Sequence, residues 1–306
     1  MSSHAARAPG AQALPAAARR PRRPWSWQRA RSRAFSVGFY LLVLVAIFVS
    51  LFPFYWILRT SLSTNADIAR GTESTGLFPS HLSTQAYSLD FCQQHFLTPL
   101  LNSAIIALAA TAITIVVATM AGYALARLPI RGSTVILGFI LLAGFFPVLA
   151  MVGPLFLVFR DLGFLDSIYP LILAYLIYTL PIATWLLRNF FAQIPRELEE
   201  AALVDGATRM QALRKVVVPV ALPGVFTAAI LAFILAWNDF TFAVSFLETP
   251  GNFTAPLAIV NLGQSQFQDF YNRIDAAVVI ITIPIALLVL FAQRRIVSGL
   301  TAGSFR

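Results

Sequence analysis

One charged segment in the second half of the chain carries the residues whose types and spacing point most directly to a task. Acidic residues crowd the start of a predicted short helix (Glu197, Glu199, Glu200), where they complement the positive end of its dipole. Asp205-Gly206 then predicts a turn, because glycine adopts a left-handed backbone without steric cost, and a second short helix follows. Small apolar residues beside a charged rim suit docking into a groove of another protein. From spacing alone, a helix that merely links two longer elements fits equally well.

Metal or catalytic chemistry finds little support elsewhere in the sequence. Cys92 and His95 form a Cys-x-x-His pair with His81 upstream. A structural zinc site needs about four such ligands, however, and Cys92 is the only cysteine. We therefore interpret these residues as an incidental thiol and histidines in a loop. The sequence contains no Gly-x-x-x-x-Gly-Lys-Ser/Thr loop and no Gly-x-Ser-x-Gly elbow, so we expect neither an ATP site nor a catalytic centre in this chain.

The composition of the 306-residue chain indicates a membrane protein. Hydrophobic residues make up 58% of the sequence and charged residues only 11%. Soluble chains are about 45–50% apolar and about 25% charged. A water-soluble globular fold is therefore excluded, and so is disorder over the whole chain. The net charge of +9 would suit a nucleic-acid partner, but its meaning depends on where the basic residues lie.

Six apolar runs are long enough for a helix to cross a bilayer core of about 30 Å. They are residues 38–58, 100–126, 135–159, 168–187, 220–245 and 276–292. With the amino terminus inside, 18 of the 22 lysines and arginines fall on the inner segments. The positive-inside rule then predicts that both termini are cytoplasmic, and no nucleic acid is needed to explain the charge. We expect an all-α polytopic membrane protein with six transmembrane helices.

The same charge map divides the chain into parts. Residues 1–37 are rich in alanine, proline and arginine without an apolar period, which predicts a disordered basic cytoplasmic arm. We expect this arm to touch anionic lipid of the bilayer. Residues 38–306 form the predicted transmembrane domain, with a cytoplasmic loop at 188–219 and a cytoplasmic tail at 293–306.

The cytoplasmic loop resembles the Glu-Ala-Ala motif of ABC importer permeases. That motif reads Glu-Ala-Ala, three residues, Gly, nine residues, then Ile-x-Leu-Pro. The matching residues keep every spacing, with valine for isoleucine and for leucine, and are Glu200-Ala201-Ala202, Gly206 and Val216-x-Val218-Pro219. The resemblance implies the type I ABC importer permease fold. It also implies that this segment is a coupling helix, seated in a cleft of a cytoplasmic ATPase subunit.

A second resemblance, over residues 38–306, is to carbohydrate permeases of the maltose and trehalose type. Four short sequence segments show this resemblance: Asn102-Ser103, Asp205-Gly206-Ala207-Thr208, Trp237-Asn238-Asp239 and Gln293-Arg294-Arg295-Ile296-Val297-Ser298-Gly299-Leu300-Thr301-Ala302-Gly303-Ser304. The resemblance implies a transport subunit, not an enzyme, that moves a sugar such as trehalose or maltose into the cytoplasm by alternating access.

The partners implied by this resemblance complete an importer in a bacterial plasma membrane. A second, homologous permease subunit would form a heterodimer with this chain. Two ATPase subunits would bind ATP and Mg, so that this chain needs no cofactor and no metal of its own. An extracytoplasmic sugar-binding protein would deliver the substrate.

The resemblances assign candidate roles to particular residues. The coupling residues are expected to be Glu200, Ala201, Ala202, Asp205, Gly206 and Pro219. The tail residues expected at the ATPase interface are Gly299, Leu300, Thr301 and Gly303. A sugar path needs aromatic faces and hydrogen-bonding groups. Its candidates are Trp237, Asn238, Asp239, Tyr178 and Asn102.

Other interpretations stay open at this point. Two positions are open for Asp239. It could line a substrate path, because ionisable residues at membrane depth face a cavity or a partner. It could instead lie at the outer membrane interface, with Trp237 as an interfacial anchor. The solute of such a permease could be another small molecule, such as a glycerol phosphate. An ion-coupled secondary transporter would show an internal repeat and mid-span carboxylates. An integral membrane enzyme would show clustered catalytic groups. Apart from Asp239, the sequence shows neither pattern.

Overall fold

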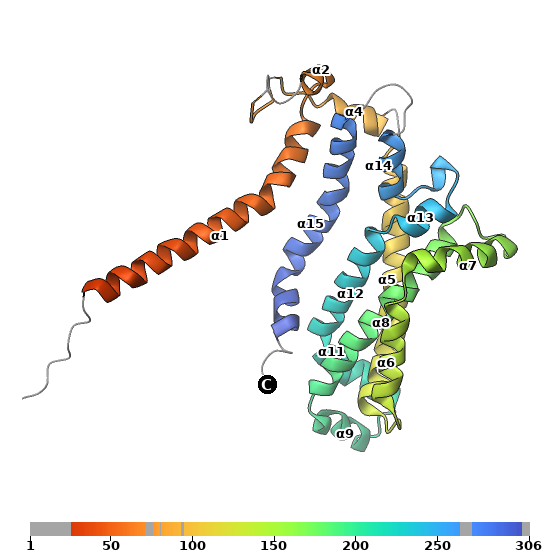
Figure 1. Cartoon of the computed structure of the whole chain (residues 1–306). Coiled ribbons are helices and arrows are strands. Elements are labelled where there is room, and N and C mark those ends of the chain that lie inside the picture. Colours follow the sequence, from red (N-terminus) through yellow and green to blue (C-terminus); the bar gives the residue numbers. More distant parts are fainter. Residues whose placement is uncertain (1–25, 71–75, 80, 93–94, 264–270, 302–306) are drawn as a thin grey trace, which may run out of the picture. The chain divides into compact units, whose positions relative to one another are not determined.

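The computed structural model describes residues 26–70, 76–79, 81–92, 95–263 and 271–301. Over these ranges the regular structure is entirely helical and no strand is present. Figure 1 shows the helices with their labels. The chain divides into two compact units, residues 1–54 and 55–306.

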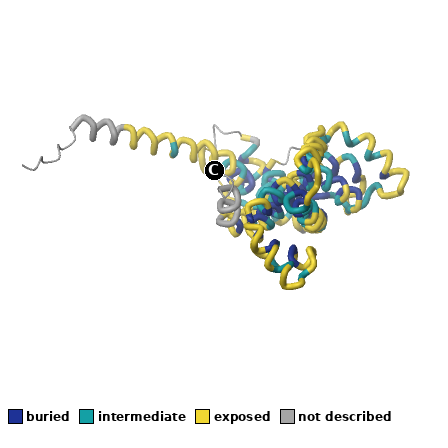
Figure 2. Tube along the Cα trace, turned by 90° about the horizontal axis from the view of Figure 1, so that it is seen from below, coloured by how far each residue is buried: buried dark blue, intermediate teal, exposed yellow. Residues whose placement is uncertain are grey.

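The described part of the first unit belongs to helix α1, Ser26–Ser61, whose last turns extend into the second unit. Its segment Phe35–Ser61 is long and apolar enough to cross a membrane. Most residues of this segment are exposed (Figure 2). A helix satisfies its own backbone hydrogen bonds, so an apolar helix exposed all round is suited to a surrounding of lipid.

Long helices build the framework of the second unit. They are α5 (Leu97–Arg127), α8 (Ile168–Gln193), α12 (Leu222–Trp237) and α15 (Tyr271–Thr301). The largest helix contact joins α5 to α8, and α12 packs on α5, α8 and α15. Gly122 brings α5 close to α8, since a Cβ at this position would lie 3.0 Å from the backbone nitrogen of Arg188. This close approach makes α5 and α8 a firmly packed pair.

The run 135–159 differs from a straight span. It forms α6 (Ser133–Gly144) and α7 (Val148–Asp161), which meet at 84°. Pro147 explains the break, because proline has no N–H to continue a helix and it disfavours helical backbone in the residue before it. A Cβ at Gly144 would lie 2.8 Å from Pro181 of α8, so this glycine lets the end of α6 pack there.

The run 220–245 is also interrupted. The segment Arg209–Val220 meets α12 at 82°, and Pro219 and Pro223 flank the bend. Helix α12 ends at Trp237, and a separate helix, α13 (Thr241–Phe246), follows. Within the described ranges, four helices are long and apolar enough to span a membrane by themselves, and the two bent pairs raise the number to as many as six, in agreement with the predicted six-helix fold.

Short helices lie at the two ends of the second unit. At one end are α2 (Asn65–Ala69), α4 (Gln85–Cys92) and α14 (Ala255–Gly263). At the other are α9 (Arg196–Val204), α10 (Arg209–Ala212), the π-helix η1 (Leu213–Val217) and α11 (Val218–Val220). Figure 1 shows that α9 and α4 mark opposite ends, with the long helices between them.

Candidate functional site

The loop between α8 and α12 folds as two short helices joined at a glycine, as predicted. Helix α9 ends at Val204, and Gly206 has a φ of 90°, a left-handed conformation that glycine adopts without steric cost. Thr208 then starts α10 with a capping box: its hydroxyl accepts a hydrogen bond from the Gln211 N–H, and its own N–H donates to Gln211 Oε1. The local sequence alone therefore sets the shape of this loop.

One face of α9 is apolar and exposed. It is formed by Leu198, Ala201 and Val204, of which Val204 is 86% accessible. Glu200 is exposed beside this row, and Ala202 is partly buried. A row of exposed apolar side chains with a charged neighbour is typical of a surface that another protein covers.

The other coupling candidates lie at the two turns of the same loop. Asp205 and Gly206 are exposed at the turn after α9, and Pro219 is exposed within α11. The structure thus brings all six coupling candidates into one continuous segment. Five of these six residues are exposed, and Ala202 is partly buried.

The opposite face of α9 is held to the long helices by a buried carboxylate. Glu199 accepts a hydrogen bond of 2.5 Å from the Tyr123 hydroxyl of α5, and its second oxygen lies 3.9 Å from Arg127 Nε. Arg127 Nη2 also donates to the carbonyls of Phe191 and Ile194. Those carbonyls end α8, where a helix leaves its last acceptors without intrahelical partners. We call Tyr123, Arg127 and Glu199 the buried triad; it joins α5, α8 and α9.

Sequence reasoning did not assign this role to the buried triad. The sequence pattern marks Glu199 only as part of the acidic first turn of a short helix, and it assigns Arg127 no contact. A usable signal was present: Arg127 lies in the last turn of α5 and Glu199 in the first turn of α9. Those are the ends at which the helix dipoles favour a cation and an anion respectively.

Three of the sugar-path candidates lie in one aromatic cluster. The rings of Tyr178 and Phe242 are stacked, with centroids 6.4 Å apart and planes 7° apart. Trp237 and Phe242 belong to the same core. Asp239 caps α13 by accepting hydrogen bonds from the backbone N–H groups of Phe242 (3.2 Å) and Ala243 (3.3 Å). Asn238 and Asp239 therefore lie at the junction between α12 and α13.

The aromatic cluster contains two polar atoms that no other described residue satisfies. The hydroxyl of Tyr178 and the indole Nε1 of Trp237 are buried without a hydrogen-bond partner within the described structure, whereas the Tyr175 hydroxyl is directed to Asp239. Both tyrosines interact electrostatically with Asp239. Buried donors without acceptors are costly, so the cluster is chemically suited to a ligand that carries several hydroxyl or ether oxygens.

The two asparagine candidates bind backbone instead. Asn102 Nδ2 donates to the carbonyls of Gly251 (2.9 Å) and Phe253 (3.1 Å), and so holds the loop before α14. Asn238 Nδ2 donates to the carbonyl of Ile234 within α12, at 2.8 Å. These contacts give both amides a structural task at the edges of the helices.

The tail candidates lie at the end of α15. Gly299, Leu300 and Thr301 belong to its last turn, and Gly303 lies outside the described residues. Helix α15 runs from the end marked by α4 toward the end marked by α9 (Figure 1). The last turn of α15 is therefore at the same end of the second unit as the coupling candidates.

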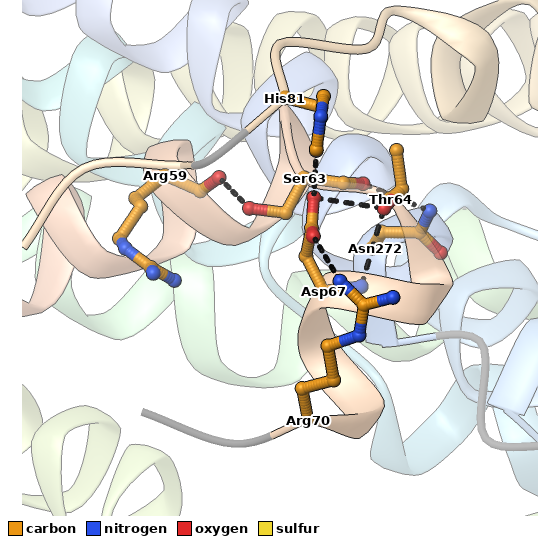
Figure 3. Close-up of polar contacts among 7 residues, drawn as sticks. All are labelled: Arg59, Ser63, Thr64, Asp67, Arg70, His81 and Asn272. Carbon is orange, nitrogen blue, oxygen red and sulfur yellow. Dashed lines mark hydrogen bonds and ion pairs between the residues drawn. The ribbon is translucent and has the colours of Figure 1, made fainter. Parts of the chain in front are cut away.

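A polar cluster at the opposite end connects the segment after α1 to α15 (Figure 3). The Asp67 carboxylate accepts a 2.9 Å hydrogen bond from the Thr64 hydroxyl, which lowers the pKa of Asp67. His81 Nδ1 lies 3.5 Å from the same carboxylate. Asn272 of α15 donates to the carbonyl of Ser63 at 3.2 Å. These bonds hold the short helix α2 against the start of α15.

A second loop contact involves Asp166, which precedes α8 and has a left-handed φ of 55°. Its Oδ1 accepts hydrogen bonds from the backbone N–H groups of Glu248 (3.0 Å) and Thr249 (2.9 Å). The Thr249 hydroxyl donates to Oδ2, and these bonds lower the pKa of Asp166 to about 2. Asp166 thus ties the start of α8 to the segment after α13.

Known proteins share both the sequence and the fold. The trehalose transport system permease protein SugB of Mycobacterium tuberculosis is 44% identical over 258 residues, which cover 84% of this chain and 93% of the relative. The sulfoquinovosyl glycerol transport system permease protein SmoH of Agrobacterium fabrum is 43% identical over 256 residues, covering 84% and 89%. A solved bacterial ABC transporter involved in the import of alginate superposes with a TM-score of 0.72 at 25% identity, covering 86% of this chain and 97% of the other.

The model of one protein family spans most of the helical core. Residues 114–301 match the inner membrane component of binding-protein-dependent transport systems. This range includes the loop with α9 and α10, the aromatic cluster and α15. The chain belongs to this family, and is accordingly a multi-pass permease subunit of an ABC importer, a transport subunit rather than an enzyme.

Proposed function

We propose that this permease subunit imports a sugar, specifically a di- or oligosaccharide such as trehalose or maltose. The observation that carries the proposal is the 44% identity, over 84% of the chain, to a trehalose permease. A further relative, the trehalose/maltose permease MalG of Thermococcus litoralis, is 34% identical over 86% of the chain. The aromatic cluster supplies rings and hydrogen-bonding groups of the kind that bind sugar hydroxyls.

In this proposal the chain works inside a larger complex. It pairs with a second, homologous permease subunit, and two ATPase subunits bind ATP and Mg. An extracytoplasmic sugar-binding protein delivers the substrate. A solved alginate transporter with such a periplasmic protein bound shares the fold at a TM-score of 0.64.

The coupling loop faces the cytoplasm in this arrangement, as do both termini. The distribution of basic residues supports this topology. The loop with α9 and the last turn of α15 lie at one end of the second unit, which also fits (Figure 1). Glu200, Ala201, Ala202, Asp205, Gly206 and Pro219 then contact an ATPase subunit, and Gly299, Leu300, Thr301 and Gly303 lie at the same interface.

Transport follows from differential affinity of ATP for the closed ATPase pair. As the ATPase subunits close, the coupling helix moves with them, and the permease rocks from inward-open to outward-open. Trp237, Asp239 and Tyr178 line the sugar path, and Asn238 and Asn102 hold its backbone edges.

The experiment is uptake by the reconstituted four-protein complex in liposomes. Radiolabelled trehalose, maltose, sulfoquinovosyl glycerol and glycerol phosphate are supplied with the binding protein, and ATP is placed on the ATPase side. ATP-dependent uptake of trehalose or maltose supports the proposal. Uptake of glycerol phosphate alone, or uptake by the single chain without ATPase, would overturn it.

A further inference from the structure

We infer that the buried triad of Tyr123, Arg127 and Glu199 is the positioning device that makes α9 move together with α5 and α8 during transport. The inference rests on the proposed function, because it gives the coupling helix a defined attachment within an importer. It concerns residues outside the Glu-Ala-Ala motif and outside the sugar path. Its basis is the burial, charge and contacts of the three side chains.

Burial separates Glu199 from its neighbours on the same helix. Its side chain is 8% accessible, whereas Glu197 and Glu200 are exposed. The side chain of Arg127 is only 3% accessible. Arg127 Nε makes no hydrogen bond to Glu199, so the two side chains attract each other electrostatically over 3.9 Å, while Arg127 Nη2 and the Tyr123 hydroxyl make the hydrogen bonds. Removing one of two such buried charges leaves the other buried alone, which is costly. The pair therefore resists separation of α9 from the end of α5.

The hydrogen bonds of the triad also fix the direction of α9. The Tyr123 hydroxyl donates to Glu199 at 2.5 Å, and charge-assisted bonds of this kind are strong and directional. Tyr123 also interacts with Arg209 at the start of α10, so one hydroxyl contacts both short helices of the loop. The ring of Tyr123 meets Phe191 of α8 edge-on, with centroids 6.5 Å apart. Tyr123 thus lies where α5, α8, α9 and α10 converge.

Helix ends make this meeting point electrostatically favourable. Arg127 lies at the negative ends of both α5 and α8, and Glu199 lies at the positive end of α9. Apolar packing alone would let α9 slide, because hydrophobic contact is non-directional. The triad adds direction, so a displacement imposed on the exposed face of α9 is passed to α5 and α8. Among the described helices, those two form the largest contact.

The test compares coupling, not activity alone. The complex is reconstituted with Tyr123→Phe, which removes one hydroxyl, and separately with Glu199→Gln, which removes one charge. The matched control is Asp161→Asn, which removes a carboxylate charge from an exposed position on α7, outside the coupling segment. For each, trehalose or maltose imported per ATP hydrolysed is measured, and both rates are divided by the amount of assembled complex.

For Tyr123→Phe and for Glu199→Gln we expect the amount of sugar imported per ATP to fall at least about fivefold, with the control unchanged. About fivefold is the lower end of the range for allosteric coupling between two sites. The double variant should lose no more than the more severe single variant, since the residues act as one unit. A ratio that stays within about twofold of the control, with import and hydrolysis falling together, overturns the inference. Where Glu199→Gln fails to assemble, the result for Tyr123→Phe decides.

A second measurement separates this inference from the proposed function. In a Cys92→Ser background, spin labels are attached at Arg196→Cys on α9 and Leu108→Cys on α5, both exposed positions. The distance distribution between them, with and without ATP, does not depend on which solute is carried. It should be narrow in the parent and broader in Tyr123→Phe. An unchanged distribution contradicts the inference even if no tested sugar is imported, whereas absent uptake with the expected broadening contradicts only the sugar assignment.

Discussion

The ring of Phe190 in α8 occupies the space into which a side chain at Gly224 of α12 would point. An ideal Cβ at Gly224 would lie 2.4 Å from Phe190 Cγ, well inside the normal contact distance. Gly224 lies in the first turn of α12, directly after the 82° bend that joins the coupling segment to this helix. The close contact therefore sets how near α8 and α12 can come where the coupling segment ends.

Replacing this glycine should loosen the contact. For Gly224→Ala we expect a loss of about 1–3 kcal/mol in stability, because overpacking forces the ring or the backbone to shift. Thermal unfolding of the detergent-solubilised complex measures the change. Gly138→Ala in α6 is the control, since nothing lies within 4 Å of the added Cβ; it should be neutral or slightly stabilising. Equal behaviour of the two variants would contradict the steric argument.

Two changes in the coupling segment should stop transport without harming membrane insertion. Gly206→Pro cannot adopt the observed φ of 90°, and Ala201→Arg places a charge in the exposed apolar face of α9. We expect sugar uptake to fall to background for both, at unchanged levels of the permease in the membrane. Uptake assays and immunoblots of membrane fractions test this together. Normal uptake by either variant would refute the role of this segment.

The aromatic cluster can be tested with changes that remove single polar atoms. Tyr178→Phe keeps the ring but removes a hydroxyl, and Asp239→Asn keeps the shape but removes a charge. Loss of one hydrogen bond of about 1 kcal/mol predicts a rise of about fivefold in the KM for sugar uptake. Tyr169→Phe, on the exposed side of α8, is the control and should leave KM unchanged. If all three variants behave alike, the cluster is a packing feature.

Acidic pH should release the loop contact made by Asp166. Its pKa is lowered to about 2 in the folded protein, from an ordinary value of 3.8. A lowered pKa means that the stabilising contribution is complete above about pH 4 and is lost as the pH falls through about 2. The difference in unfolding temperature between the parent and Asp166→Asn should shrink between pH 5 and pH 2.5. Asparagine is a suitable replacement because it tolerates the left-handed backbone. If the difference in unfolding temperature did not change with pH, the stabilising role of Asp166 would be contradicted.

Local sequence sufficed wherever the structure depends on near neighbours. The turn at Gly206, the acidic first turn of α9 and the apolar runs of α5 and α8 follow from residues within a few positions of one another. Pro147 is a partial exception. Its effect on a helix is local, but the continuous apolar run 135–159 predicts one straight span, and the angle of 84° between α6 and α7 is set only in the packed fold, where the end of α6 lies against Pro181 of α8.

Contacts between distant segments were beyond the reach of sequence patterns. Tyr123 and Glu199 are 76 positions apart, and nothing in the spacing of either segment marks them as partners. The same holds for Asn102, which resembled a path residue but binds carbonyls about 150 positions away. Burial and hydrogen bonding across helices depend on the packed fold, whereas motifs depend only on order along the chain.

The contrast between α1 and α8 has a consequence for how the protein is made. Phe35–Ser61 consists almost entirely of residues that lipid can surround, so α1 is suited to leave the translocation machinery for the bilayer as soon as it is synthesised. Over half of the apolar window of α8 is covered by protein, and it carries Thr179 and Thr184 in buried positions. Helix α8 therefore gains its proper surroundings only once α5 is in place. We therefore expect an ordered biogenesis, in which α1 enters the bilayer as an independent span and α8 completes its insertion by packing against α5.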